Sequence, residues 1–143
     1  MPSAPAKSTM LLAHDLRETL GMLVRRVRAE PGPPAHVMAV LALLDRQGPA
    51  GVSDLAAVQK MRPQSMAQTV REMESSGLVS RRPDPDDGRR AFVELTAEGR
   101  RMLKATRAAR EDWLAQALDR ELDAGEREAV REALALLARV AES

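Results

Sequence analysis

Apolar residues recur at helical spacing in four stretches of the chain. The first runs from Thr9 to Glu30 and ends at PGPP, and the second, HVMAVLALLDRQ, stops at Gly48-Pro49. Two more run from residue 97 to about residue 119 and from residue 123 to the end. In the last stretch, Asp123 and Glu126 have the spacing of a capping box. The pattern therefore predicts a mainly α chain with long helices at both ends.

The middle of the chain carries shorter elements. Ser53 is placed to cap a short helix over SDLAAVQK with Leu55 and Val58 facing inward, and Pro63 suits the start of a further helix that ends at Gly77. Two extended segments, LVSRR and RAFVEL, then flank PDPDDG, whose proline, aspartates and glycine are typical of turns. Thr96, after the second segment, can cap the next helix. Two short helices followed by a small β-wing predict a winged helix-turn-helix.

Composition limits the classes of function. The 22 basic and 21 acidic side chains nearly cancel, so a nucleic-acid role must depend on where the charges lie. The absence of cysteine excludes a disulfide, a thiol switch and a Cys-ligated zinc site. No apolar run reaches the roughly 18 residues that a membrane span needs. We therefore expect a cytoplasmic protein without a membrane segment.

The expected organisation is a flexible tail at residues 1–8 and a single domain at residues 9–143. Within the domain, residues 9–47 and 97–143 supply the N- and C-terminal dimerisation helices, and residues 51–96 form the winged helix-turn-helix lobe. The terminal helices carry more apolar surface than a small winged domain can cover. A helical interface between two copies would bury the surplus, so we expect a homodimer.

These motifs resemble, in order, those of the MarR family of transcriptional regulators from about residue 10 onward. The matching pieces are HVMAVLALL, SDLA, SMAQTVREMESSGLVSR and DDGRRAFVELTAEGR. They include the family's Gly-Leu-Val at residues 77–79, the Asp-x-Arg of the wing at residues 87–89 and a Val-x-Leu-Thr with a following glycine at residues 93–99. The resemblance implies a sequence-specific, homodimeric DNA-binding regulator, a repressor on a pseudo-palindromic operator, whose first and last helices intertwine.

The chain departs from the family pattern at two positions. Ala67-Gln68 stands where the family often has Thr-Arg, and glutamine favours adenine edges where arginine favours guanine. Arg62 stands where a Ser or Thr cap is common, so the recognition helix should lack that cap, and Arg62 could meet phosphate instead. The departures concern base preference and capping, not the overall motif order.

Candidate contacts to double-stranded DNA lie on the second short helix and on the hairpin. Gln64, Gln68 and Arg71 align at spacings of four and three, and amide and guanidinium groups are suited to base edges and phosphates. A hairpin tip is narrow enough to present an arginine to a minor groove about 6 Å wide. The expected set comprises Ser53, Arg62, Pro63, Gln64, Ser65, Gln68, Thr69, Arg71, Asp87, Arg89 and Arg90.

The hairpin residues have different expected roles. Arg89 would enter the minor groove, and Asp87 would hold either this arginine or the turn through a charge-assisted hydrogen bond. Arg90 would meet backbone phosphate or a neighbouring acid, and Asp84 and Asp86 are turn residues. The alternative for the whole lobe is a winged-helix module for protein interaction, without sequence-specific DNA binding.

Neither catalysis nor a bound metal is expected. No nucleophile–base–acid order, phosphate-binding glycine loop or carboxylate pair stands out, so the chain is not expected to be an enzyme. A metal site would need two carboxylates beside the only two histidines, and we expect no metal and no cofactor. The family and the basic groups of the first helix favour a small anionic aromatic or lipophilic effector that releases DNA. Its candidate residues are His14, Arg17, Arg25, His36 and Trp113, for which packing or solvent exposure is the alternative.

Overall fold

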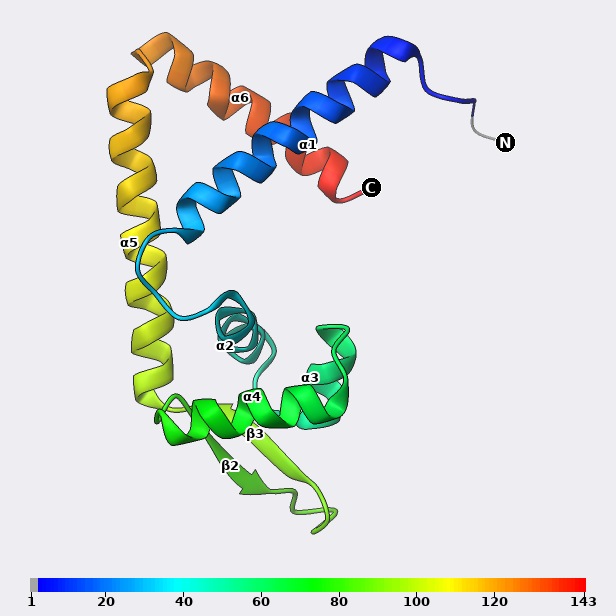
Figure 1. The fold of residues 1–143 in the computed structure, drawn as a ribbon, viewed down its shortest axis with the longest axis vertical. Coiled ribbons are helices and arrows are strands. Elements are labelled where there is room, and N and C mark those ends of the chain that lie inside the picture. The colour runs from blue at the N-terminus through cyan, green and yellow to red at the C-terminus, as the bar shows by residue number, and fades with distance from the viewer. Residues whose placement is uncertain (1–2) are drawn as a thin grey trace. The chain divides into compact units, whose positions relative to one another are not determined.

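The computed structural model describes residues 3–143 and divides the chain into two compact units (Figure 1). The helical unit contains the chain up to Glu30 together with Ala109–Ser143, and the winged unit is Pro31–Ala108. No helix among the described residues is long and apolar enough to cross a membrane.

The helical unit consists of α1 (Lys7–Arg28), the second half of α5 (Ala97–Glu121) and α6 (Ala124–Ala141). Helix α1 begins at Lys7, two residues earlier than predicted, so residues 7 and 8 of the expected tail are helical. Residues 1 and 2 of that tail lie outside the described residues. The predicted capping box of α6 is confirmed: Glu126 N donates to Asp123 Oδ1 at 2.8 Å, and Asp123 N donates to Glu126 Oε1 at 3.0 Å.

The winged unit contains α2 (Ala35–Gln47), α3 (Val52–Val58), α4 (Pro63–Ser75), the start of α5 and a three-stranded antiparallel sheet. The sheet has the order β1–β3–β2, with β1 at Ala50–Gly51, β2 at Val79–Pro83 and β3 at Ala91–Leu95. The predicted two-stranded wing is confirmed. Strand β1, which pairs through Ala50 and Gly51 with β3, is an addition that two residues without an alternating pattern could not predict.

Every buried hydrophobic residue among those described belongs to the winged unit. Helix α2 supplies six of them, and Leu55, Met66, Val70 and Val93 complete the centre of the core. Residues 35–47, which the sequence pattern grouped with the dimerisation helices, thus form the core of the winged unit instead. An apolar helix needs a neighbour on most of its faces, and its own pattern does not say which neighbour it has.

Two local expectations for α3 were wrong. Ser53 does not cap this helix, because α3 begins at Val52 and its N-cap position is Gly51, without a side-chain hydrogen bond. Val58 does not face inward and is 52% exposed, whereas Leu55 is fully buried. Gly48 and Gly77, by contrast, have positive φ angles of 83° and 76°, as expected for residues that end a helix.

Thr96 joins three elements of the winged unit. Its hydroxyl donates to the Gly77 carbonyl at 2.6 Å and accepts from Gly99 N at 3.0 Å, so the predicted cap of α5 is confirmed. Thr96 N also donates to the Leu78 carbonyl at 3.1 Å. A Cβ at Gly99 would stand 2.1 Å from that carbonyl oxygen, so only glycine fits there. These contacts fix the base of the hairpin beside the end of α4.

Candidate nucleic-acid interface

Helix α4 has one face in the core and one face in solvent. Pro63 occupies its first turn, and Met66, Val70 and Met73 pack inward at helical spacing. The opposite face exposes four of the predicted contact residues, namely Gln64, Ser65, Gln68 and Arg71. Thr69, which belongs to the expected set of DNA contacts, is only 5% exposed and lies with the core residues, so its side chain is not on the solvent face.

The exposed face of α4 carries a short hydrogen-bond network. Arg71 Nη2 donates to Gln68 Oε1 at 2.8 Å, and Gln68 Nε2 donates to Glu72 Oε1 at 3.1 Å. Both ends of the Gln68 amide are therefore engaged within the helix. Arg62, at the N-cap position, makes no side-chain cap, as its identity predicted. The amide and guanidinium groups of this face can exchange their internal partners for those of a ligand.

The hairpin tip is organised by its aspartates. Asp87 Oδ1 accepts from Arg89 N at 3.0 Å, and Asp84 Oδ1 accepts from Asp86 N at 2.8 Å. Asp87 therefore holds the backbone of the turn, which is one of the two roles considered for it. The backbone bond from Arg90 N to the Asp87 carbonyl, 3.0 Å long, closes the same turn. The side chain of Arg89 is left exposed at the tip.

Three arginines surround a cavity of about 260 Å³ at the side of the hairpin. We call it the arginine pocket; it is lined by Arg81, Arg89, Arg90, Ala91 and residues 51–53. It brings together Ser53, Arg89 and Arg90 from the predicted set. Because three positive groups share one cavity with the Ser53 side chain, the pocket is suited to an anion with several oxygen atoms, such as a phosphate.

Two carboxylates lie at the border of the arginine pocket. Asp54 Oδ2 is 3.2 Å from Arg90 Nη2, and Glu74 Oε2 is 3.5 Å from Arg81 Nε. A Cβ at Gly51 would lie 3.3 Å from both partners of the Asp54–Arg90 pair, so this pair sits directly over the glycine. Arg90 therefore pairs with a neighbouring acid, which is one of the two partners expected for it.

Sequence reasoning missed Arg81 and Asp54 as residues of this site. Arg81 is absent from the expected set, although its place two positions after Val79 puts the two residues on the same face of the strand. Asp54 reaches Arg90 because β1 and the start of α3 lie next to β3, a neighbourhood that no local pattern indicates.

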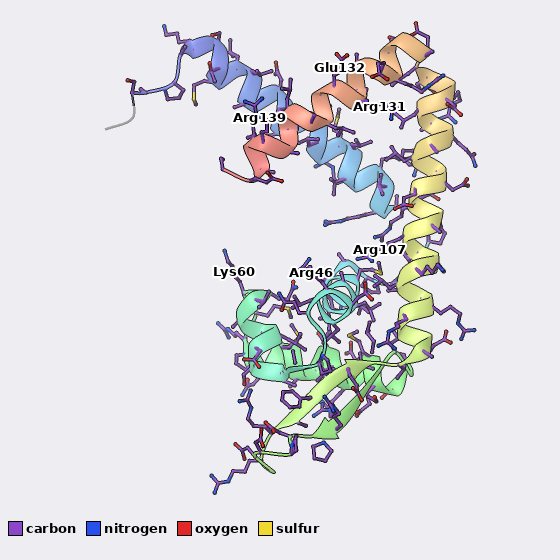
Figure 2. All side chains as sticks on the ribbon, turned by 180° about the vertical axis from the view of Figure 1, so that it is seen from behind. Arg46, Lys60, Arg107, Arg131, Glu132 and Arg139 are labelled. Carbon is purple, nitrogen blue, oxygen red and sulfur yellow. The ribbon has the colours of Figure 1, made fainter. Side chains whose placement is uncertain are left out.

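Basic side chains are not confined to this side of the winged unit. In Figure 2, Arg46, Lys60 and Arg107 project on the side opposite to the hairpin. Arg107 there forms a 3.6 Å ion pair with Asp45. The candidate interface is therefore defined by the arrangement of the arginine pocket and the α4 face, and not by a general excess of positive charge.

The predicted effector residues are divided between the two units. His14 and Arg17 are exposed on α1, where Arg17 pairs with Glu18 at 2.9 Å. Trp113 lies under Arg26, whose guanidinium carbon is 4.1 Å from the centroid of the ring, and this arginine was not predicted. Arg25 is exposed on α1, and His36 borders a cavity of the winged unit. No three potential metal-ligating side chains gather within the part of the chain that the structure describes.

Comparisons with known proteins agree on one family. A model of the MarR family matches residues 37–91. HTH-type transcriptional regulators of Mycobacterium bovis and Mycobacterium tuberculosis are each 35% identical to this chain over 129 residues, which cover 88% of this chain and 90% of theirs. The crystal structure of a Pseudomonas aeruginosa transcriptional regulator has 36% identity and a TM-score of 0.84, over 97% of this chain and 99% of that one. A mutant MarR from E. coli shares the fold at 20% identity and a TM-score of 0.69, over 96% and 99% of the two chains.

Replacing Asp54 by Asn should strengthen binding to the polyanion heparin, because Arg90 loses its ion-pair partner. Both side chains of the pair are more than half exposed, so the free energy of unfolding should change by less than about 1 kcal/mol. The salt concentration at elution from heparin and the thermal unfolding curve measure the two effects. Asp112→Asn, which makes the same charge change in the helical unit, is the control. Equal elution of the two variants would show that Asp54 does not restrain Arg90.

Proposed function

Because the chain belongs to the MarR family of transcriptional regulators, we propose that it is a homodimeric repressor that acts in the cytoplasm on a pseudo-palindromic operator. The α4 helices of the two copies would enter successive major grooves, and the hairpins would reach the flanking minor grooves. The observation that carries this proposal is the arginine pocket, which lies in the same unit as the exposed polar face of α4.

The face of α4 supports direct reading of bases. The amide of Gln68 can bond adenine through its oxygen and its nitrogen together. To do so, it must give up its hydrogen bonds to Arg71 and Glu72. A matching base replaces both bonds, whereas a base of the wrong pattern replaces at most one and leaves a polar group without a partner. The network on α4 therefore supports discrimination between sites. Gln64 and Ser65 lie exposed one turn earlier, where they would extend the contact.

The hairpin and the start of α3 support contacts that do not depend on sequence. Arg89, exposed at the tip, would enter the minor groove by shape and charge. Arg81, Arg90 and Ser53 would hold a backbone phosphate in the arginine pocket, for which Asp54 acts as the internal competitor. Arg62, exposed at the uncapped start of α4, would meet a second phosphate.

The helical unit supports the homodimer. None of its described residues is buried, so its helices have no core of their own. Isolated helices without packed apolar faces are marginal in water, and a second copy of the same helices would supply the missing partner. The large apolar side chains left exposed on α1 and α6 are Met10, Leu11, Leu12, Leu20, Met22, Leu23, Val24, Val130, Leu134, Leu136 and Val140.

Release by a small anionic effector stays a prediction, based on the family and on the basic groups of α1. If salicylate-like acids neither stabilise the protein against heat nor release it from DNA, that class of effector is excluded. The alternative function, a winged-helix module for protein interaction, predicts no preference for an operator over random duplex and no fall in affinity as salt rises.

Two substitutions separate specificity from general affinity. Gln68→Ala should weaken binding to the operator by about 1–3 kcal/mol and leave binding to random duplex nearly unchanged, because only base reading is lost. Arg89→Ala should weaken binding to both duplexes and make the salt dependence shallower, because a cation is removed from the groove. Fluorescence anisotropy with both duplexes at two salt concentrations measures these effects. A Gln68→Ala variant that weakens both duplexes equally would exclude base reading by this residue.

The sign of the Asp87→Ala effect tests the role of the turn. Simple electrostatics predicts tighter binding when an acid near phosphate is removed. We expect weaker binding, in the direction of Arg89→Ala but smaller, because Asp87 accepts from Arg89 N and thereby orders the tip. Asp86→Ala is the matched control, since it removes the same charge and no side-chain hydrogen bond of the turn. Tighter binding by Asp87→Ala, equal to that of the control, would contradict the ordering role.

Deleting residues 123–143 should give a monomer or an unfolded chain and abolish operator binding, because the α6 part of the proposed dimer surface is removed. Since loss of folding alone could explain that result, Leu134→Glu serves as a milder change at a residue that is 59% exposed. Its light-scattering mass should fall towards the monomer. Ala135→Glu, at an exposed alanine on the face of the same helix that carries Glu128 and Glu132, is the control and should leave the mass unchanged. A Leu134→Glu protein and a truncated chain that both remain dimeric would refute the assembly.

A further inference from the structure

A second cavity of the winged unit, bordered by His36 of the expected effector residues, takes no part in the DNA contacts proposed above. It measures about 400 Å³ and is lined by residues from the start of α2, the end of α4 and the first turns of α5. Its floor is apolar, formed by Val37, Met73, Leu78 and Met102. The volume falls within the range of about 300–1,000 Å³ that is typical of small-molecule sites. The two methionines can adapt to ligands of different shape.

The rim of this cavity is acidic. Glu72 of α4 and Glu98 of α5 line it, whereas no lysine or arginine does, and we therefore call it the acid-rimmed pocket. Glu98 already pairs with Arg101. The side chain of Glu72 accepts only from the neutral amide of Gln68 among the contacts of the described residues, so its negative charge is not balanced by an ion pair.

The dipoles of the helices that end or begin at the pocket do not change the negative sign of its charge. Helix α4 has no basic residue in its last turn, so the negative end of its dipole carries no side-chain compensation. Helix α2 starts at the same pocket and contributes a positive end, which amounts to about half a charge. Two full carboxylates, one of them without a cationic partner, outweigh it. His36, which also lines the pocket, is exposed to solvent.

We propose that the acid-rimmed pocket binds a small organic monocation with an apolar body, such as an arylalkyl ammonium compound. The ammonium group binds the carboxylate of Glu72, and the apolar body covers Val37, Met73, Leu78 and Met102. A neutral molecule of the same shape gains the apolar contact but not the charge-assisted hydrogen bond. An anion would be repelled by the two carboxylates. The ligand is thus opposite in charge to the effector expected from the resemblance.

The site is connected to the base-reading face through Glu72. This carboxylate holds Gln68 Nε2, and Gln68 in turn holds Arg71. An ammonium group on Glu72 competes for the carboxylate oxygens and offsets a negative charge on the helix that faces DNA. Both effects favour the operator-bound arrangement of Gln68. The ligand should therefore tighten operator binding, and DNA should tighten ligand binding by the same factor. This coupling rests on the proposed function, whereas binding of the ligand does not.

Calorimetric titration of the full chain without DNA tests the binding. The probes are 4-phenylbutylamine and its neutral isostere 4-phenylbutanol. The amine should bind about tenfold more tightly than the alcohol, and Glu72→Gln should remove this advantage. Glu74→Gln, an equal change on the same helix outside the pocket, should retain it. Circular dichroism confirms that each variant is folded. Equal affinity of the amine and the alcohol, or an advantage that survives Glu72→Gln, would overturn the proposal.

Operator titration with and without the amine tests the coupling. We expect saturating amine to lower the operator Kd by about fivefold in the unmodified protein and not in Glu72→Gln. A protein that binds the amine but no DNA would contradict the proposed function and leave the binding site standing. A protein that binds DNA but not the amine would contradict the binding site alone. Binding of both without any change in operator Kd would overturn the connection through Glu72.

Discussion

The hydroxyl of Thr96 makes the contact on which the geometry of the winged unit depends. It donates to the carbonyl of Gly77 and accepts from Gly99 N, so it uses a donor and an acceptor at the point where α4 ends, β3 ends and α5 begins. The hairpin extends from this point, and its arginines are placed beside the polar face of α4 only while its base is fixed. The absence of a Cβ at Gly99 allows α5 to start against the Leu78 carbonyl. A small polar contact in the scaffold thus positions residues that lie much nearer to the proposed DNA.

Most of the fold could be predicted because its signals are local. Helical periodicity, the Asp123–Glu126 box, the left-handed glycine at 77 and the turn residues of the hairpin each concern a few neighbouring residues. Strand β1 could not be predicted, since two residues show no period and its existence depends on pairing with Phe92 and Val93. The place of α2 could not be predicted either. An apolar helix indicates that it is buried, and only the tertiary structure shows that its partners are the winged elements.

The candidate site, like the fold, contains some features that depend on neighbouring residues and others that depend on residues far apart in the sequence. The row Gln64, Gln68 and Arg71 follows from the helical period alone, and the burial of Thr69 follows from the same period, since position 69 lies between Met66 and Met73 on the inward face. The Asp54–Arg90 pair joins residues 36 positions apart and depends on the unpredicted neighbourhood of β1 and β3. The Glu72–Gln68–Arg71 network lies within one helix, but the spacing of these residues in the sequence does not determine their side-chain rotamers. The sequence therefore indicates which groups are present, and the structure shows which of them are already engaged.

The contact between Arg26 and Trp113 makes the intrinsic tryptophan fluorescence of the protein a probe of its helical unit. Trp113 is the only tryptophan and the chain contains no tyrosine, so selective excitation reports on the helical unit alone. The guanidinium carbon lies 4.1 Å from the centroid of the indole ring, where its displacement would change the emission. Phe92, the remaining aromatic residue, lies in the wing and does not emit under those conditions. A spectral change on adding duplex would therefore originate in the helical unit, outside the residues proposed to contact DNA, and its time course would show how quickly DNA binding affects that unit.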